Sequence, residues 1–256
     1  MLIDINKAEK EFLKYTEDFN HEDNRITRKI SHSLRVKEIS RQIAEAELKT
    51  KEEKDLAELI GLLHDIGRFE QAKQIDSFKD SILDHADVGV EVLSNNSYIR
   101  NFIEDKSCDS VILKAIKNHN KFKIEDGLNE DELKQAKIIR DADKLDILYL
   151  YSEMNDLSYL VEGKNPSNEN ISKKVLDAFF EERQINKEDL EFFLDHYINT
   201  ISFIFDLNEK YSFRYLKEKN YMNVIIDKME KLTPVVIPIF EKIREFTNDY
   251  LERKSI

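Results

Sequence analysis

The sequence has little glycine, proline or cysteine, and acidic residues outnumber basic ones. Five glycines and three prolines among 256 residues leave few turn signals, so we expect long helices. The single cysteine, Cys108, excludes an intramolecular disulfide and fits a reducing compartment. The net charge of −12 disfavours polymeric nucleic acid as a partner, because that partner attracts basic surfaces. A small anionic substrate stays compatible, since metal ions and basic side chains can reverse the charge of a local site.

We also expect neither an export segment nor a membrane segment. The N-terminus lacks a basic start followed by an apolar run, so we expect no signal peptide. No apolar stretch reaches the length that spans a bilayer. Charged residues make up 36% of the chain, which suits the solvated outer faces of a helical protein. We therefore expect a cytoplasmic protein that has no membrane partner.

Apolar residues recur at helical spacing along most of the chain and predict an all-α fold. The expected helices cover residues 4–19, 26–47, 51–67, 85–94, a segment from about 109 to 119, 130–153, 171–183, 188–207, 213–232 and 235–254. Residues 68–83 are expected to form a loop, and residues 155–170, with Gly163 and Pro166, a linker. We expect a metal-binding helical core over residues 1–155 and a C-terminal helical extension over 156–256 packed on it.

A histidine and an aspartate stand side by side at the end of an apolar helical run. The run follows the helical repeat through Leu56, Leu59, Ile60 and Leu63, so His64 continues its buried face. Burying an imidazole beside the carboxylate of Asp65 is unfavourable unless a partner satisfies both. A divalent metal ion is the obvious partner, because it binds both groups. Gly67 is expected to end this helix, and Arg68 places a positive charge near the pair.

Other polar residues share apolar helical stripes with hydrophobic neighbours: His32, His85, His119 and Asp143. His85 lies in the first turn of its helix, for which Asp84 is the expected N-cap. Gly89 in the same helix suggests the close approach of another backbone. Asp141 and Asp146 lie off the stripe or at its edge, and we expect them to support ligands or form salt bridges. His21 is expected in an exposed loop and His196 in a structural position.

Each of these residues has a structural interpretation by itself, but the set is hard to explain as an ordinary core. Six buried polar groups would each need a separate partner. Helical bundles build metal sites from side chains on facing helices, and one metal centre would satisfy all six. The pattern therefore predicts a buried metal site.

The order H…HD…H…H…D resembles the HD-domain superfamily of metal-dependent phosphohydrolases, whose core motif appears here as His64-Asp65-Ile66-Gly67. The resemblance covers about residues 25–150. It implies that His32, His64, Asp65 and Asp143 hold one metal. It also implies either a second metal at His85 and His119, bridged by Asp65, or contact of these two histidines with substrate phosphate. HD-GYP phosphodiesterases share much of this order, but their Gly-Tyr-Pro signature is missing here, so cleavage of cyclic di-GMP is not supported.

The resemblance further implies hydrolysis of a small phosphate ester, of which a nucleotide is the expected kind. Metal-activated water would attack phosphorus, with Asp65 orienting or deprotonating that water. Arg68 and Lys144 are the candidates for neutralising the phosphate, although both also suit solvated cations at helix ends. One or two ions are expected, from manganese, iron, cobalt, nickel, magnesium or zinc, since the ligand types suit several of these metals.

Two other functions stay open from the sequence. HD-fold di-iron oxygenases similar to myo-inositol oxygenase share the same six-ligand order, so the ligands do not separate the two chemistries. A catalytically silent nucleotide-binding module is the third possibility, against which the intact ligand set argues. The C-terminal helices carry no motif, and their apolar side chains suit either a cover over the site or a homodimer surface.

Overall fold

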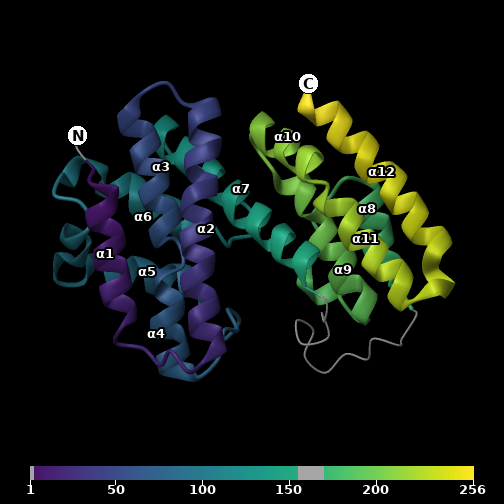
Figure 1. The fold of residues 1–256 in the computed structure, drawn as a ribbon, viewed down its shortest axis with the longest axis horizontal. Coiled ribbons are helices and arrows are strands. Elements are labelled where there is room, and N and C mark those ends of the chain that lie inside the picture. Colours follow the sequence, from purple (N-terminus) through teal and green to yellow (C-terminus); the bar gives the residue numbers. More distant parts are fainter. Residues whose placement is uncertain (1–2, 155–169) are drawn as a thin grey trace. The chain divides into compact units, whose positions relative to one another are not determined.

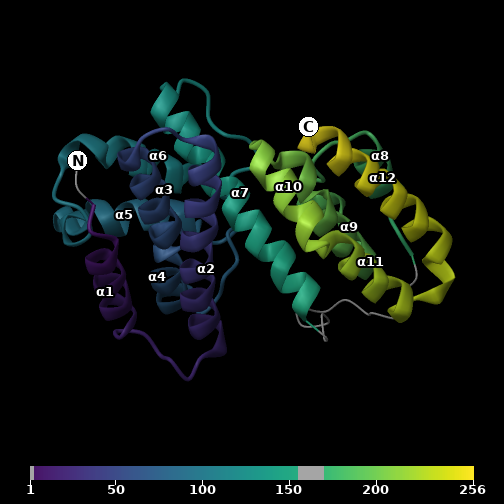
Figure 2. The ribbon, with the colours of Figure 1, turned by 45° about the horizontal axis from the view of Figure 1, so that its top comes forward.

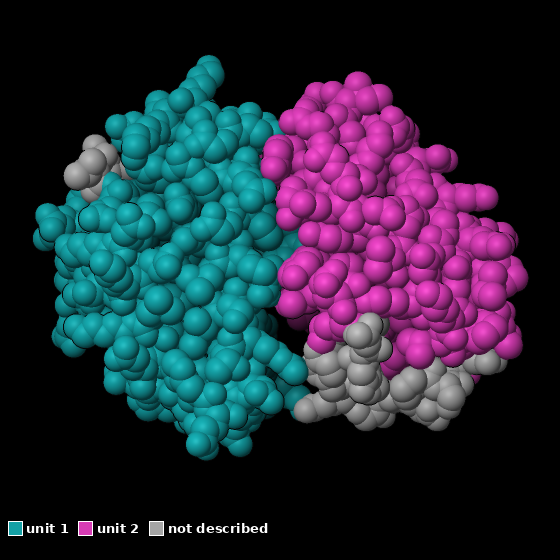
Figure 3. Space-filling view, viewed as in Figure 1, with its two compact units in different colours: residues 1–146 teal, residues 147–256 magenta. Residues whose placement is uncertain are grey.

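A computed structural model of the chain describes residues 3–154 and 170–256, and these residues form helices and connecting loops without a β-strand. The predicted all-α fold is confirmed. The chain divides into two compact units, Met1–Asp146 and Ile147–Ile256 (Figure 3). The predicted linker at 155–170 lies almost entirely outside the described residues. None of the described helices is both long and apolar enough to cross a membrane.

The first unit contains the residues predicted to bind metal. Its helices are α1 (Ile5–Thr16), α2 (Asn24–Glu47), α3 (Lys51–Leu63), α4 (Ile66–Ile75), α5 (His85–Ser94), η1 (Asn95–Asn101), η2 (Lys106–Cys108), α6 (Asp109–Asn118) and the first part of α7 (Glu130–Glu153) (Figure 1). Where one predicted helix corresponds to one observed helix, the bounds agree within about three residues, except at the end of α3.

Side-chain caps fix where several of these helices begin. Asp84 accepts hydrogen bonds from the backbone N–H groups of Ala86 and Asp87, as predicted for the start of α5. Thr50 and Glu53 form a capping box at the start of α3, in which each side chain bonds the backbone N–H of the other. His85 therefore stands at a fixed helix terminus.

The predicted stripe on α3 is buried, and α3 packs along α2 (Figures 1 and 2). A side chain at Gly61 would place its Cβ 2.6 Å from Ser40 Oγ and 2.9 Å from the backbone oxygen of Val36. The two helices can approach this closely only because Gly61 has no side chain. This contact brings the end of α3, with His64 and Asp65, beside α2.

The sequence-based expectation for residues 64–83 is partly wrong. The helix ends at Leu63 instead of residue 67, and α4 occupies part of the predicted loop. Gly67 therefore does not end a helix but lies in the first turn of α4. Its ideal Cβ would lie 2.1 Å from the backbone oxygen of His85 and 2.4 Å from the nitrogen of Gly89. The close backbone approach expected at Gly89 is confirmed, and Gly67 permits it.

The second unit holds the remaining helices. They are the end of α7, α8 (Lys173–Phe180), η4 (Lys187–Asp189), α9 (Phe193–Ile201), η5 (Ser202–Asp206), α10 (Lys210–Lys219), α11 (Tyr221–Leu232), η6 (Pro234–Val236) and α12 (Ile237–Ser255). The single helix predicted over 188–207 is wrong, because two short 3₁₀ segments flank α9. The single helix predicted over 213–232 is also wrong, because Asn220 adopts a left-handed conformation (φ 59°) between α10 and α11.

Candidate metal centre

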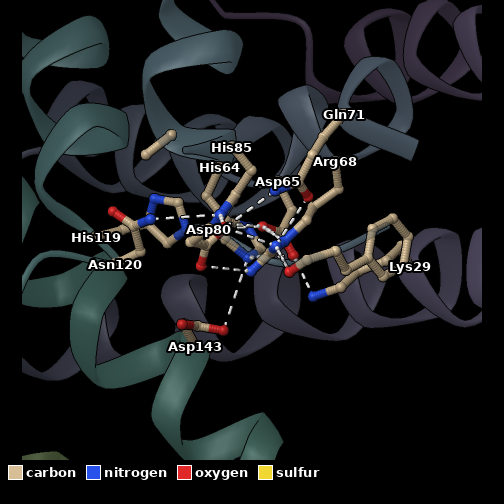
Figure 4. A network of polar contacts seen from close by, with 12 residues as sticks. Lys29, His64, Asp65, Arg68, Gln71, Asp80, His85, His119, Asn120 and Asp143 are labelled. Atoms are coloured by element: carbon tan, nitrogen blue, oxygen red, sulfur yellow. Dashed lines mark hydrogen bonds and ion pairs between the residues drawn. The ribbon is translucent and has the colours of Figure 1, made fainter. Parts of the chain in front are cut away.

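The six residues predicted as metal ligands come together in the first unit. Figure 4 labels His64, Asp65, His85, His119 and Asp143 among them. The six residues lie on α2 (His32), in the bend between α3 and α4 (His64 and Asp65), at the start of α5 (His85), just after α6 (His119) and on α7 (Asp143). The four imidazoles and Asp65 are each at most 3% exposed, and Asp143 has a 15% exposed side chain. The bend at His64 and Asp65 lets both side chains point into the same buried space.

The first group of ligand atoms surrounds one point. His32 Nε2 lies 3.2 Å from His64 Nε2 and 3.1 Å from Asp143 Oδ1. Asp65 Oδ2 lies 3.5 Å and 3.6 Å from these two histidine nitrogens. Ligand atoms that sit about 2.1 Å from a common ion lie about 3 to 3.5 Å apart, so these separations suit a single ion.

A second group uses the other oxygen of the same carboxylate. Asp65 Oδ1 lies 3.1 Å from His85 Nε2 and 3.6 Å from His119 Nε2, and the two Nε2 atoms are 2.9 Å apart. Asp65 thus offers Oδ2 to one histidine pair and Oδ1 to the other. This is the arrangement of a carboxylate that bridges two ions.

The hydrogen bonds of the outward nitrogens, the four Nδ1 atoms, explain why the inward Nε2 atoms are available to bind a metal ion. His32 Nδ1 faces Asp146 Oδ2 at 2.6 Å, and His85 Nδ1 faces Asp80 Oδ1 at 2.6 Å. The corresponding atoms of His64 and His119 face the backbone oxygens of Gly61 and Ile116, at 2.8 Å and 2.6 Å. Carbonyl oxygens and ionised carboxylates only accept hydrogen bonds, so every Nδ1 must donate. The neutral rings then present lone pairs at Nε2, which is the form that binds metal.

Burial and neighbouring charges shift the pKa values of several of these histidines and aspartates in opposite directions. Burial lowers the pKa of His64 to about 3 and also lowers the pKa of His119, so both rings are neutral. Burial alone would raise the pKa of Asp65, but Lys29 and the surrounding histidines bring it well below the ordinary value. Desolvation also opposes charge on His32, yet its contacts with Asp143 and Asp146 raise its pKa. The site therefore combines ionised carboxylates with neutral rings at His64 and His119, while Asp143 and Asp146 favour a proton on His32 that a bound metal ion would replace.

The donor set fits divalent metal ions. Two imidazole nitrogens that face each other at about 3 Å repel unless a proton or a metal cation lies between them, and such a pair of Nε2 atoms occurs in two places here. His32, His64, Asp65 and Asp143 would hold one ion, and His85, His119 and Asp65 a second. The smaller protein ligand set at the second position leaves coordination sites for water or substrate.

The sequence analysis missed two charged residues at this site. Lys29 Nζ lies 2.6 Å from Asp65 Oδ2. A signal for Lys29 was present, since it stands one helical turn before His32 on α2. Asp80 lies in the loop between α4 and α5, where no periodicity marks a residue for attention, and it contacts His85, Arg68 and Gln71.

Other predicted residues take varied positions. Arg68 lies beside the site, with Nε 3.6 Å from Asp65 Oδ1 and its terminal nitrogens on Asp80. Lys144 is buried on α7 and is only 9% exposed. Asp146 supports His32 as expected, and Asp141 is also buried. Two histidines lie apart from the two pairs: His21 is exposed and contacts Thr16, and His196 is half-buried in the second unit.

An all-helical fold with two histidine pairs around a shared aspartate defines a class of helical metal-binding proteins. Residues 30–148 match the model of one family, the HD domain, which confirms the predicted resemblance over this part of the chain. HD domains typically bind divalent metals and are commonly metal-dependent hydrolases of a phosphohydrolase superfamily. No curated protein and no solved structure matches the chain.

Proposed function

We propose that the protein is a metal-dependent phosphohydrolase that cleaves a small phosphate ester, with nucleotides as the substrate class. The observation that supports this most directly concerns the two histidine pairs, His32–His64 and His85–His119. Their Nε2 atoms face inward, one pair near each carboxylate oxygen of Asp65. The match of residues 30–148 to the HD domain also supports the proposal, because this domain suggests a metal-dependent phosphohydrolase.

Each group in the site has an assigned role in the proposed reaction. His32, His64, Asp65 and Asp143 would hold one divalent ion, and His85, His119 and Asp65 would hold a second. Bound ions polarise a phosphoryl oxygen and lower the pKa of water. Asp65 orients the attacking water through its position between the two histidine pairs.

Positive side chains near Asp65 would neutralise the phosphate. The whole chain carries a net charge of −12, so an anionic substrate needs local cations to bind. Lys29 and Arg68 approach Asp65 within 2.6 Å and 3.6 Å, and we assign phosphate contacts to them together with Lys144. His85 and His119 would contact the phosphate directly if only the first position holds an ion.

The test is a metal-by-substrate screen of hydrolysis, read as orthophosphate release where a terminal phosphate is removed and as nucleotide products separated by chromatography for the other substrates. Protein purified without chelator is assayed with manganese, iron, cobalt, nickel, magnesium or zinc against nucleoside mono-, di- and triphosphates, cyclic nucleotides and dinucleoside polyphosphates. We expect His64→Ala and Asp65→Ala to lose metal and turnover together, because each removes a ligand. His21→Ala is the control, since His21 lies in an exposed position away from the site. Turnover retained in either ligand variant would place the activity elsewhere.

Oxygen consumption and nucleotide binding, measured on the same metal-loaded samples, separate the other two functions. A di-iron oxygenase would consume oxygen and show a di-iron spectrum without releasing phosphate. A silent module would bind nucleotide in the presence of metal without turning it over. Either result would overturn the proposed hydrolase.

A further inference from the structure

The two histidine pairs share a pattern in the hydrogen-bond acceptors of their outward nitrogens, the Nδ1 atoms. In each pair one Nδ1 faces a backbone oxygen, and the other faces a carboxylate from outside the metal ligand set. The carboxylates are Asp146 for the pair His32–His64 and Asp80 for the pair His85–His119. Each potential ion therefore has its own outer carboxylate.

Asp80 is held in place by several groups. Its Oδ1 accepts hydrogen bonds from His85 Nδ1 at 2.6 Å, from Arg68 at 2.8 Å and from Gln71 at 3.2 Å. Its Oδ2 accepts a second bond from Arg68 at 3.2 Å. Burial opposes ionisation, but His85 and Arg68 lower the pKa of Asp80, so it remains a carboxylate. Arg68 also bonds the backbone oxygen of Phe78, which ties this loop to α4.

Asp146 makes the corresponding contacts at the His32–His64 pair. Its Oδ2 faces His32 Nδ1 at 2.6 Å, and Arg35 donates to both of its oxygens at 2.6 Å and 2.9 Å. Both outer carboxylates thus contact an arginine on one side and a histidine Nδ1 on the other. A carboxylate that accepts from an imidazole fixes the ring and makes its other nitrogen a stronger metal donor.

We infer that Asp80 is a positioning residue that controls the ion at the His85–His119 position, separately from Asp146 at the His32–His64 position. The inference rests on the proposed metal centre and goes beyond it, because it assigns the two positions independent control. It also gives Arg68 the task of holding Asp80 beside His85. Loss of an outer carboxylate of this kind lowers metal affinity by about 10- to 100-fold.

The experiment titrates the metal-free protein with Mn²⁺ alone, followed by calorimetry and electron paramagnetic resonance. We expect two ions in the unmodified protein, with the spectrum of a coupled pair. In Asp80→Asn one of the two ions should bind about 10- to 100-fold more weakly, and the spectrum should match that of His119→Ala. Asp146→Asn should instead resemble His32→Ala.

Asp84→Asn is the matched control for charge. It removes the same negative charge four residues away, asparagine still caps α5, and Asp84 is not the carboxylate that holds His85 Nδ1. We expect it to retain both ions with unchanged affinity. An equal loss of metal affinity in Asp84→Asn and Asp80→Asn would overturn the inference. The loss would then come from removing a negative charge near the site and not from the contact with His85.

The failures of the inference and of the proposed function are distinguishable. If the unmodified protein binds no Mn²⁺ or any other of the six metals, the metal centre itself is wrong. If it binds metal and Asp80→Asn binds the same number of ions with the same affinity, only the role of Asp80 is wrong. Circular dichroism in chelator confirms that each variant is folded before titration.

Discussion

Glu53 at the start of α3 couples helix capping to pH. Its carboxylate accepts bonds from the backbone and hydroxyl groups of Thr50 and from Lys134. These contacts, led by the backbone bond, lower the pKa of Glu53 to about 2. A pKa below that of the unfolded chain stabilises the fold above about pH 4.5, and this contribution is lost as the pH falls from there toward 2. We expect Glu53→Gln to lower the free energy of unfolding by about 1 kcal/mol at pH 7.

Urea unfolding of both proteins between pH 7 and pH 3 measures this effect. The two free energies should begin to converge below about pH 4.5, because the unfolded carboxylate gains a proton there whereas the native one gains it only near pH 2. Glu52→Gln, an exposed neighbour in the same turn, should show no such convergence. A difference for Glu53→Gln that stays constant across this pH range would contradict the assignment.

Individual site residues could be predicted where they lie at helical spacing among apolar neighbours. His32, His119 and Asp143 share apolar stripes with their neighbours, and the structure brings them beside His64 and Asp65. Asp80 could not be found in this way, because a loop residue has no period and its role depends on a contact with His85. Whether these residues bind metal stays a prediction.

Contact between elements depends on Gly67, which permits α4 to approach the start of α5. An alanine Cβ there would overlap the backbone of His85 and Gly89, which cannot move aside as a flexible side chain can. We expect Gly67→Ala to lower the free energy of unfolding by about 1–3 kcal/mol and to weaken binding at the His85–His119 position. Chemical denaturation and Mn²⁺ titration measure the two effects.

Gly89→Ala is the matched control on the facing helix. Its added Cβ would meet its nearest neighbours at 3.4–3.6 Å, which is ordinary contact. Because alanine also favours the helix by up to about 1 kcal/mol, this variant should be at least as stable as the unmodified protein. Equal destabilisation by both substitutions would show that the close approach is not set by Gly67.

Helix existence was more predictable than helix ends. The periodic patterns gave α2, α5 and α7 nearly as observed, since amphipathic spacing persists over their length. The break between α3 and α4 was missed because His64 and Asp65 continue the apolar pattern while the backbone bends. Asn220 was missed although a local signal was present, because lysines in the last turn followed by asparagine are typical of a helix end.

At the scale of the whole molecule, the division into two units falls at residues 146 and 147, inside α7. The sequence-based boundary was placed after this helix, where glycine and proline occur. A continuous helix has no turn residue at the point where its contacts change from one group of helices to another, so composition could not mark that point. The expected packing of the C-terminal helices on the first unit stays a prediction.

Metal binding should stabilise the folded molecule as a whole. A ligand that binds only the folded state adds about 2.7 kcal/mol at 100 times its dissociation constant. We expect Mn²⁺ at that excess to raise the melting temperature relative to chelator, because the ion removes the repulsion between inward-facing histidine nitrogens. The shift should shrink in His64→Ala. The shift is measured for each protein with and without metal. The stability that His64→Ala loses through the cavity at position 64 is present in both measurements and therefore cancels. Equal shifts in the two proteins, measured by differential scanning calorimetry, would show that the ion binds somewhere other than between these imidazoles.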